Sequence, residues 1–172
     1  MTTSYRLVAA LATVALAAGA GTAFADGGHG HDGRDDDHHQ HGTAFKADLF
    51  GSQPTGPTLF AAKPGGAPWV IREGSAKVRR DGRVKVRVDG LVIPTAPQNG
   101  TNPLSNIAAT VYCNGAAVGT TKAAPFSTAG DARIDDRVAT PLPSPCLAPA
   151  VLINPAPGGV VSAGVYIAAS GV

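Results

Sequence analysis

Residues 74–88 read Gly74-Ser-Ala-Lys-Val-Arg-Arg-Asp-Gly-Arg-Val-Lys-Val-Arg-Val88. Apolar and polar residues alternate through this segment, and its apolar residues all stand at even positions: Ala76, Val78, Val84, Val86 and Val88. Strict alternation is typical of a β-strand with one buried face, and Asp81-Gly82 in the middle marks a turn. The segment therefore predicts a β-hairpin.

The apolar positions also select the loop of this hairpin. A two-residue loop at residues 81–82 would place Val78 opposite Lys85 and mix the two faces. A three-residue loop at residues 80–82 pairs Val78 with Val84 instead, so that both strands bury the same face. We therefore expect a type I turn followed by a bulge, with the glycine of the loop in the left-handed conformation.

The same register turns five basic side chains outward: Lys77, Arg79, Arg83, Lys85 and Arg87. It sets Lys77 against Lys85, and like charges directly opposite each other destabilise a sheet. An anionic partner such as a cell-wall polymer, or the acidic tail of the protein itself, would compensate for this repulsion. The alternative is that Lys and Arg on an exposed edge strand block sheet-to-sheet aggregation. Because no aromatic residue lies between the basic ones, we expect no specific nucleic-acid partner.

Residues 107–120 predict a second hairpin. A two-residue turn at Asn114-Gly115 pairs Val111 with Val118 and Cys113 with Ala116. This register turns four residues toward the core, namely Ile107, Ala109, Val111 and Cys113. The chain has two cysteines without C-x-x-C spacing, and in an oxidising compartment they imply one structural disulfide, Cys113–Cys146.

The rest of the chain alternates short apolar runs with loops, in keeping with its 22 Gly and 14 Pro residues. The further candidate strands are Phe45–Phe50, a strand opening at Trp69-Val70-Ile71, Arg133–Ala139, Ala148–Asn154 and Gly164–Ser170. Residues 44–172 contain no amphipathic run long enough to predict a helix. About eight short strands favour a single all-β domain over residues 44–172, either an antiparallel sandwich of the Ig-like or Greek-key type or an open barrel.

The amino-terminal region predicts export. Residues 1–25 have the pattern of a secretory signal peptide, with Arg6 ahead of an apolar run and Ala23-Phe24-Ala25 as the cleavage site. We therefore expect a secreted product, cut after Ala25 and left without a stable membrane anchor. Residues 26–43 contain no large apolar residue and predict a disordered tail.

All five histidines of the chain lie in this tail, among acidic residues. The candidate metal ligands are His29, His31, His38, His39, His41, Asp35, Asp36 and Asp37. Imidazole and carboxylate suit zinc, copper or nickel, so a scavenger of these metals is one hypothesis; the alternative is a solvated spacer. Five Asp and one Arg give the tail a charge of −4 with neutral His, so the net charge of +2 conceals two oppositely charged segments.

Because residues 42–172 contain no histidine, a Ser-His-Asp triad cannot form there. Carboxylates remain, and a pair of them could hydrolyse a glycoside. Asp136 stands out because it has the parity of Ile134 and Val138, so it is predicted to face inward unless a bulge intervenes. A single inward Asp does not form an acid–base pair. We therefore expect a non-catalytic protein with a binding or structural role and no required cofactor, and a carboxylate hydrolase is the less favoured alternative.

Two resemblances agree with this interpretation. The signal segment, the context Pro145-Cys-Leu-Ala-Pro149 and the closing Val165-Tyr-Ile-Ala-Ala-Ser-Gly171 resemble a loose group of small exported proteins of high-GC Gram-positive (actinobacterial) type. The stretch from Phe45-Lys-Ala-Asp-Leu-Phe-Gly51 to Asp89-Gly-Leu91 is similar to a CHRD-type β-domain. Both imply a secreted β-rich protein, and neither implies an activity or a site.

Overall fold

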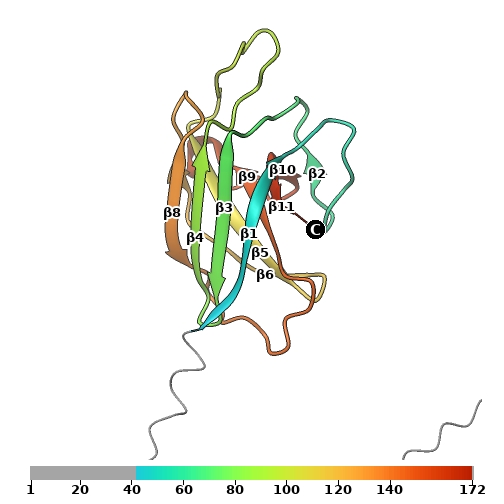
Figure 1. The fold of residues 1–172 in the computed structure, drawn as a ribbon, viewed down its shortest axis with the longest axis vertical. Helices are drawn as coiled ribbons and strands as arrows, with labels where there is room; N and C mark the ends of the chain where they lie inside the picture. The colour runs from blue at the N-terminus through green and yellow to red at the C-terminus, as the bar shows by residue number, and fades with distance from the viewer. Residues whose placement is uncertain (1–41, 172) are drawn as a thin grey trace, which may run out of the picture. The chain divides into compact units, whose positions relative to one another are not determined.

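The computed structural model of the chain describes residues 42–171, which fold into β-structure (Figure 1). The strands are β1 (Thr43–Gly51), β2 (Lys63–Pro64), β3 (Glu73–Arg79), β4 (Arg83–Asp89), β5 (Asn106–Cys113), β6 (Ala116–Thr120), β7 (Ala124–Pro125), β8 (Ala132–Arg137), β9 (Ala150–Pro155), β10 (Val165–Tyr166) and β11 (Ala168–Ser170). The only helical element in these residues is a 3-10 turn, η1 (Pro157–Gly159). Nothing in the described residues is therefore a helix that could cross a membrane.

Eight strands follow one another in one sheet, in the order β6-β5-β9-β11-β1-β3-β4-β8, and β7 pairs with β5 beside this path. All of these pairs are antiparallel. The sheet curls into a half-barrel, with β8, β4, β3 and β1 in front and β9, β5 and β6 behind in Figure 1. This confirms the predicted all-β antiparallel fold of about eight short strands, in its open-barrel form. A small parallel pair, β2 with β10, was not expected.

The sheet changes direction in β1. Residues 45–48 of this strand pair with β3, whereas residues 49–51 pair with β11. We call β1, β3, β4 and β8 the front half, and β11, β9, β5, β6 and β7 the back half. Leu49, at the change of partner, is buried between them.

The first hairpin has the predicted register. Val78 lies opposite Val84 and Ala76 opposite Val86, and Gly82 has φ +84°. The even-numbered residues of both strands are buried in the main core, which lies between the two halves of the sheet. The parity of the apolar residues and the turn glycine were sufficient to predict this hairpin.

The central strands of the back half are buried on both faces. Their outer face holds a second apolar cluster, made of Ala62, Tyr112, Ala150, Leu152 and Tyr166. Phe60 stacks on the Tyr112 ring with the ring centroids 4.2 Å apart. The segment around β2 and β10 thus covers β5 and β9, which explains why these strands are almost continuously buried.

The register predicted for the second hairpin is confirmed at the turn but is wrong farther along the strands. Cys113 pairs with Ala116, and both turn residues have positive φ. Val111, however, lies opposite Gly119 and not opposite Val118, because the register shifts between Val111 and Tyr112. A Cβ atom at Gly119 would stand 2.9 Å from Cβ of Val138. The bulge therefore places Gly119, the glycine of β6, at the point where Val138, just after β8, comes closest to this strand.

Two other predicted strands are also wrong in detail. Trp69-Val70-Ile71 opens no strand: Val70 forms an isolated bridge with Val92, while the Trp69 backbone N–H binds Ser52 O as the chain passes the end of β1. Residues 164–170 form two short strands because β10 pairs with β2, whereas β11 pairs with β1 and β9. The two predicted strands at residues 133–139 and 148–154 correspond to β8 and β9 with shifted ends.

Candidate functional site: a charged face on the front half

The outer face of the front half is a grid of charged side chains from four adjacent strands. One row across the strands consists of Lys46, Lys77, Lys85 and Asp135. The next row consists of Asp48, Ser75, Arg87 and Arg133. Because alternate residues of a strand share a face, the apolar core on the inside fixes these charges on the outside. We call this surface the charged face.

A shallow depression of about 450 Å³ lies in the charged face. The charged side chains that line it are Lys46, Lys77, Lys85, Arg87, Arg133 and Asp135. Five of them are positive and one is negative. Ser75, the smallest side chain of the lining, stands opposite Arg87. The depression therefore combines open space with a net positive charge.

Two carboxylates of this face form ion pairs with its basic side chains. Asp135 accepts hydrogen bonds from Arg83 Nε at 2.9 Å and Arg83 Nη2 at 3.1 Å, and lies 3.2 Å from Lys85 Nζ. These contacts, Arg83 foremost, lower the pKa of the Asp135 carboxyl. Asp89 accepts a hydrogen bond from Arg87 Nε, which lowers the pKa of the Asp89 carboxyl in the same way. Asp89 Oδ1 also lies 3.7 Å from Arg133 Nη2.

The five basic residues predicted from the sequence therefore have different environments. Arg83 and Lys85 share Asp135, Arg87 binds Asp89, and Arg79 Nε lies 3.8 Å from Asp81. Lys77 forms no ion pair within residues 42–171, and its neighbour Lys46 forms none there either.

The alternative that these charges protect a sheet edge is wrong. β3 lies between β1 and β4, and β4 lies between β3 and β8, so neither strand is an edge. Like-charged pairs in the middle of a sheet do not block edge-to-edge pairing, because no edge is exposed there.

Sequence reasoning missed the basic residues that β1 and β8 contribute, namely Lys46, Arg133 and Arg137. Each stands at a polar position of an alternating strand, so parity predicts that it is exposed. That these strands flank the hairpin depends on strand order, which no local pattern contains. The same holds for Asp135, whose position opposite Lys85 was not foreseen.

Asp136 has the predicted inward parity, near one end of β8. It is half-buried, and its Oδ2 accepts a 2.7 Å hydrogen bond from the Lys122 backbone N–H. This bond, with a second from the Arg137 backbone, lowers the pKa of the Asp136 carboxyl. A general acid at neutral pH needs a raised pKa. The lowered pKa does not suit that role, and the hydrogen bond from Lys122 gives Asp136 a structural role between β8 and the segment after β6.

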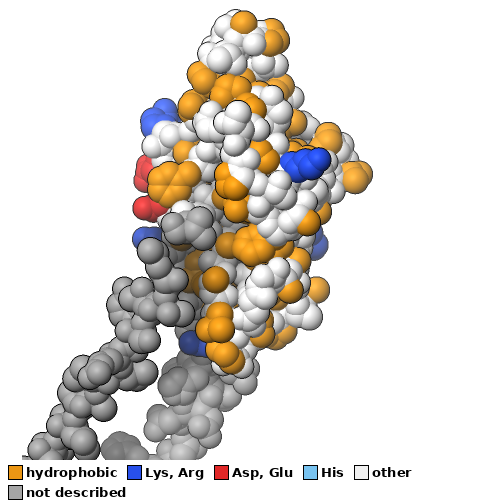
Figure 2. Space-filling view, turned by 90° about the vertical axis from the view of Figure 1, so that its right-hand side faces the viewer, with side chains coloured by type: hydrophobic (Ala, Val, Ile, Leu, Met, Phe, Trp, Pro, Cys, Tyr) orange, Lys and Arg blue, Asp and Glu red, His pale blue; other side chains and the backbone are white. Residues whose placement is uncertain are grey.

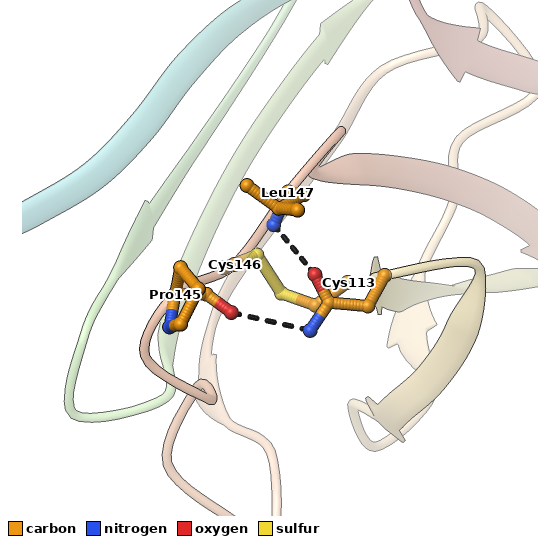
Figure 3. Close-up of a disulfide and its surroundings, with 5 residues drawn as sticks. Cys113, Pro145, Cys146 and Leu147 are labelled. Atoms are coloured by element: carbon orange, nitrogen blue, oxygen red, sulfur yellow. Dashed lines mark hydrogen bonds between the residues drawn. A yellow bond between two sulfur atoms is a disulfide. The ribbon is translucent and has the colours of Figure 1, made fainter.

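The disulfide between Cys113 and Cys146 is confirmed, with a Cα–Cα distance of 5.1 Å. Figure 3 shows the two hydrogen bonds that flank it. The Asn114 side chain donates to Pro145 O at 3.1 Å and accepts from Leu147 N at 2.7 Å. The Asn114 backbone N–H also binds Leu147 O at 2.9 Å. The segment around Cys146 is therefore held to the β5–β6 turn on both sides of the disulfide.

The predicted metal ligands, His29, His31, His38, His39, His41, Asp35, Asp36 and Asp37, lie outside the described residues, as does the cleavage site. The acidic tail considered as a partner of the basic hairpin lies there too, apart from its last two residues. Within residues 42–171, no three His, Cys, Asp or Glu side chains are grouped so that they could hold a metal ion.

Another side of the molecule differs from the charged face. Figure 2 looks onto the side that lies to the right in Figure 1. There hydrophobic side chains, backbone and side chains without charge cover most of the surface, with few charged side chains among them. The acidic side chains in this view lie at its left margin.

Comparisons of the chain with family models, with curated proteins and with solved structures gave no match.

Proposed function

We propose that the protein is an exported, non-catalytic binding protein whose charged face holds an anionic polymer of the cell envelope or the extracellular medium. The observation that supports this function is the depression lined by five basic side chains and one acidic side chain. Lys46 and Lys77 stand there without ion-pair partners in the described residues. A surface depression lined mainly by charges of one sign attracts and concentrates counterions. The disulfide and the signal-like segment support export.

A charge-matched pair of variants tests this function. Lys46→Gln with Lys77→Gln removes two unpaired charges from the charged face, whereas Lys63→Gln with Lys122→Gln removes two exposed charges elsewhere. Affinity for dextran sulfate is measured at several salt concentrations. At about 1 kcal/mol per basic residue facing an anionic surface, the first variant loses affinity about tenfold or more, and the control changes little.

Salt gives a second readout of the same interaction. Binding through exposed charges weakens as salt rises, because the Debye length falls from about 30 Å at 0.01 M to about 10 Å at 0.1 M. Equal losses in both double variants, or binding that ignores salt, would contradict the proposed function.

Metal uptake by the tail is the second candidate function, and the gathering of all five histidines in one short segment favours it. Zinc, copper and nickel are titrated into the intact protein and into a variant without residues 26–41. The candidate requires micromolar or tighter binding that is lost on deletion. Binding that survives the deletion would exclude the tail as the site.

A further inference from the structure

We infer that Arg87, Arg133 and Ser75 form a subsite within the charged face for a tetrahedral oxyanion, that is, a phosphate or sulfate ester of the bound polymer. This inference rests on the proposed function and specifies the chemistry of its ligand. The three residues lie in one row across β3, β4 and β8, with Ser75 opposite Arg87 and Arg87 opposite Arg133. All three line the depression.

Asp89 holds the two arginines without neutralising both. It binds Arg87 through Nε and lies 3.7 Å from Arg133 Nη2. Two positive charges thus share the Asp89 carboxylate, and one net positive charge remains among these three groups. Two further carboxylates lie near them: Glu73 acts on the Arg87 charge, and Asp48 stands opposite Ser75. The Asp89 side chain is only 14% exposed, whereas those of Arg87 and Arg133 are 52% and 61% exposed. The carboxylate is therefore largely buried, whereas both arginine side chains are more than half exposed to solvent.

The hydrogen bond from Nε leaves the terminal nitrogens of Arg87 available. Neither Nη atom of Arg87 has a hydrogen-bond partner in the described residues. The neighbouring Arg83 differs, because its Nε and Nη2 both bind Asp135. A guanidinium that is fixed at one nitrogen and open at the others is set to bind an oxyanion through two parallel hydrogen bonds. Arg87 fits this description, and Arg83 does not.

The size of the depression and the donors around it favour an ester on a chain over a free ion. Its volume of about 450 Å³ lies in the range of sites for small organic ligands, about 300–1,000 Å³. The Ser75 hydroxyl forms no hydrogen bond within residues 42–171, so it is free to donate to a ligand. Lys46 and Lys77, in the adjacent row, can meet the next anionic group along a polymer.

The arrangement of the donors distinguishes tetrahedral anions from carboxylates. Arg87, Arg133 and Ser75 stand in one row on three adjacent strands, so the row offers three separate donor side chains to one bound group. A phosphate or sulfate ester presents several oxygens in different directions, whereas a carboxylate presents two oxygens in one plane. We therefore expect a preference for sulfated and phosphorylated chains.

The test compares Arg87→Lys with Arg83→Lys. Both substitutions keep the charge, remove a guanidinium and lie in the same strand. Affinities are measured for dextran sulfate, for carboxymethyl dextran of matched length and charge density, and for polyphosphate. Arg87→Lys is expected to weaken sulfate binding, phosphate binding or both by about tenfold or more, since each lost charge-assisted hydrogen bond costs about 1.5 kcal/mol. Binding of carboxymethyl dextran is little affected. Arg83→Lys leaves all three affinities nearly unchanged. The sulfate and phosphate arms show which ester is preferred.

The outcomes separate this inference from the proposed function. If all polymers bind and Arg87→Lys weakens them equally, the charged face binds anions but the subsite is refuted. If no polymer binds, the proposed function fails, and the subsite is then judged by titrating inorganic phosphate while recording the amide NMR signals of the protein. Shifts confined to Ser75, Arg87, Arg133 and their neighbours support the subsite, and unchanged signals refute it. Thermal unfolding of each variant verifies that it is folded.

Discussion

The Asp136 carboxylate in β8 accepts a 2.7 Å hydrogen bond from the Lys122 backbone N–H, in the segment between β6 and β7. β6 and β8 are the two ends of the strand order and do not pair with each other. Nearby, Thr140 Oγ1 donates to Val118 O at 2.9 Å. Side chains therefore join the two ends of the curled sheet where no ladder of backbone hydrogen bonds joins them.

Removing the Asp136 carboxylate is expected to destabilise the fold. Asp136→Ala removes the carboxylate that accepts the Lys122 backbone N–H, and the loss of this hydrogen bond lowers the free energy of unfolding by about 1 kcal/mol. Asp136→Asn keeps an acceptor oxygen and loses less. Urea unfolding measures both variants against Asp48→Ala, in which an exposed carboxylate without a hydrogen bond is removed. A loss in Asp48→Ala as large as that in Asp136→Ala would contradict this role.

The same bond predicts a pH dependence. The Lys122 and Arg137 backbone amides hold the pKa of Asp136 below its value in the unfolded chain, about 3.9. The stabilisation is therefore complete above pH 3.9 and is lost as the pH falls through the folded pKa. Other acidic groups titrate in this range too, so the measured quantity is the difference in unfolding free energy between the wild type and Asp136→Asn. This difference should be larger at pH 7 than at pH 2.5, and a constant difference would be evidence against the bond.

The parts of the fold that the sequence predicts are those governed by local alternation. The hairpin of β3 and β4 needs only the parity of its valines and one turn glycine, and its register was predicted residue by residue. The bulge at Val118 in the second hairpin was not predicted. Its cause is the close approach of Val138 to Gly119, a contact between residues 19 positions apart in the sequence. Trp69 was misassigned because a strand and a buried crossing segment have the same apolar composition.

The residues of the charged face also fall into those that local alternation predicts and those that it does not. The basic residues of the hairpin were found because they alternate with core residues on the same two strands. Their neighbours, Lys46 in β1 and Arg133 in β8, could be recognised as exposed but not as adjacent. Adjacency follows from the sheet order, and that order follows from how the whole curled sheet buries its core. The sequence therefore indicated the charge of the site but not its shape or its ion pairs.

Gly119 gives a test of the packing at the junction of β6 and β8. A methyl group at this position would meet Cβ of Val138 at 2.9 Å, so Gly119→Ala is expected to lower the unfolding free energy by about 1–3 kcal/mol through overpacking. Gly164→Ala is the control, because an added Cβ there meets nothing within 4 Å. Thermal or urea unfolding should show the control unchanged or slightly stabilised. An unchanged free energy of unfolding in Gly119→Ala would contradict this prediction, because Val138 would then have moved aside without a measurable cost.

Asn114 is expected to protect the disulfide from reduction. Its side chain bonds to Pro145 and Leu147 on either side of Cys146, and Cys146 is more exposed than Cys113. Asn114→Gly keeps a residue that tolerates the φ of +54° and removes both side-chain bonds. At about 1 kcal/mol for each of the two bonds, local opening around Cys146 becomes about 30-fold more frequent, and dithiothreitol reduces the folded protein correspondingly faster. Asn99→Gly is the matched control, since Asn99 also has positive φ but bonds to Pro97 in another loop. Equal reduction rates in the two variants would show that the hydrogen bonds of Asn114 do not limit access to the disulfide.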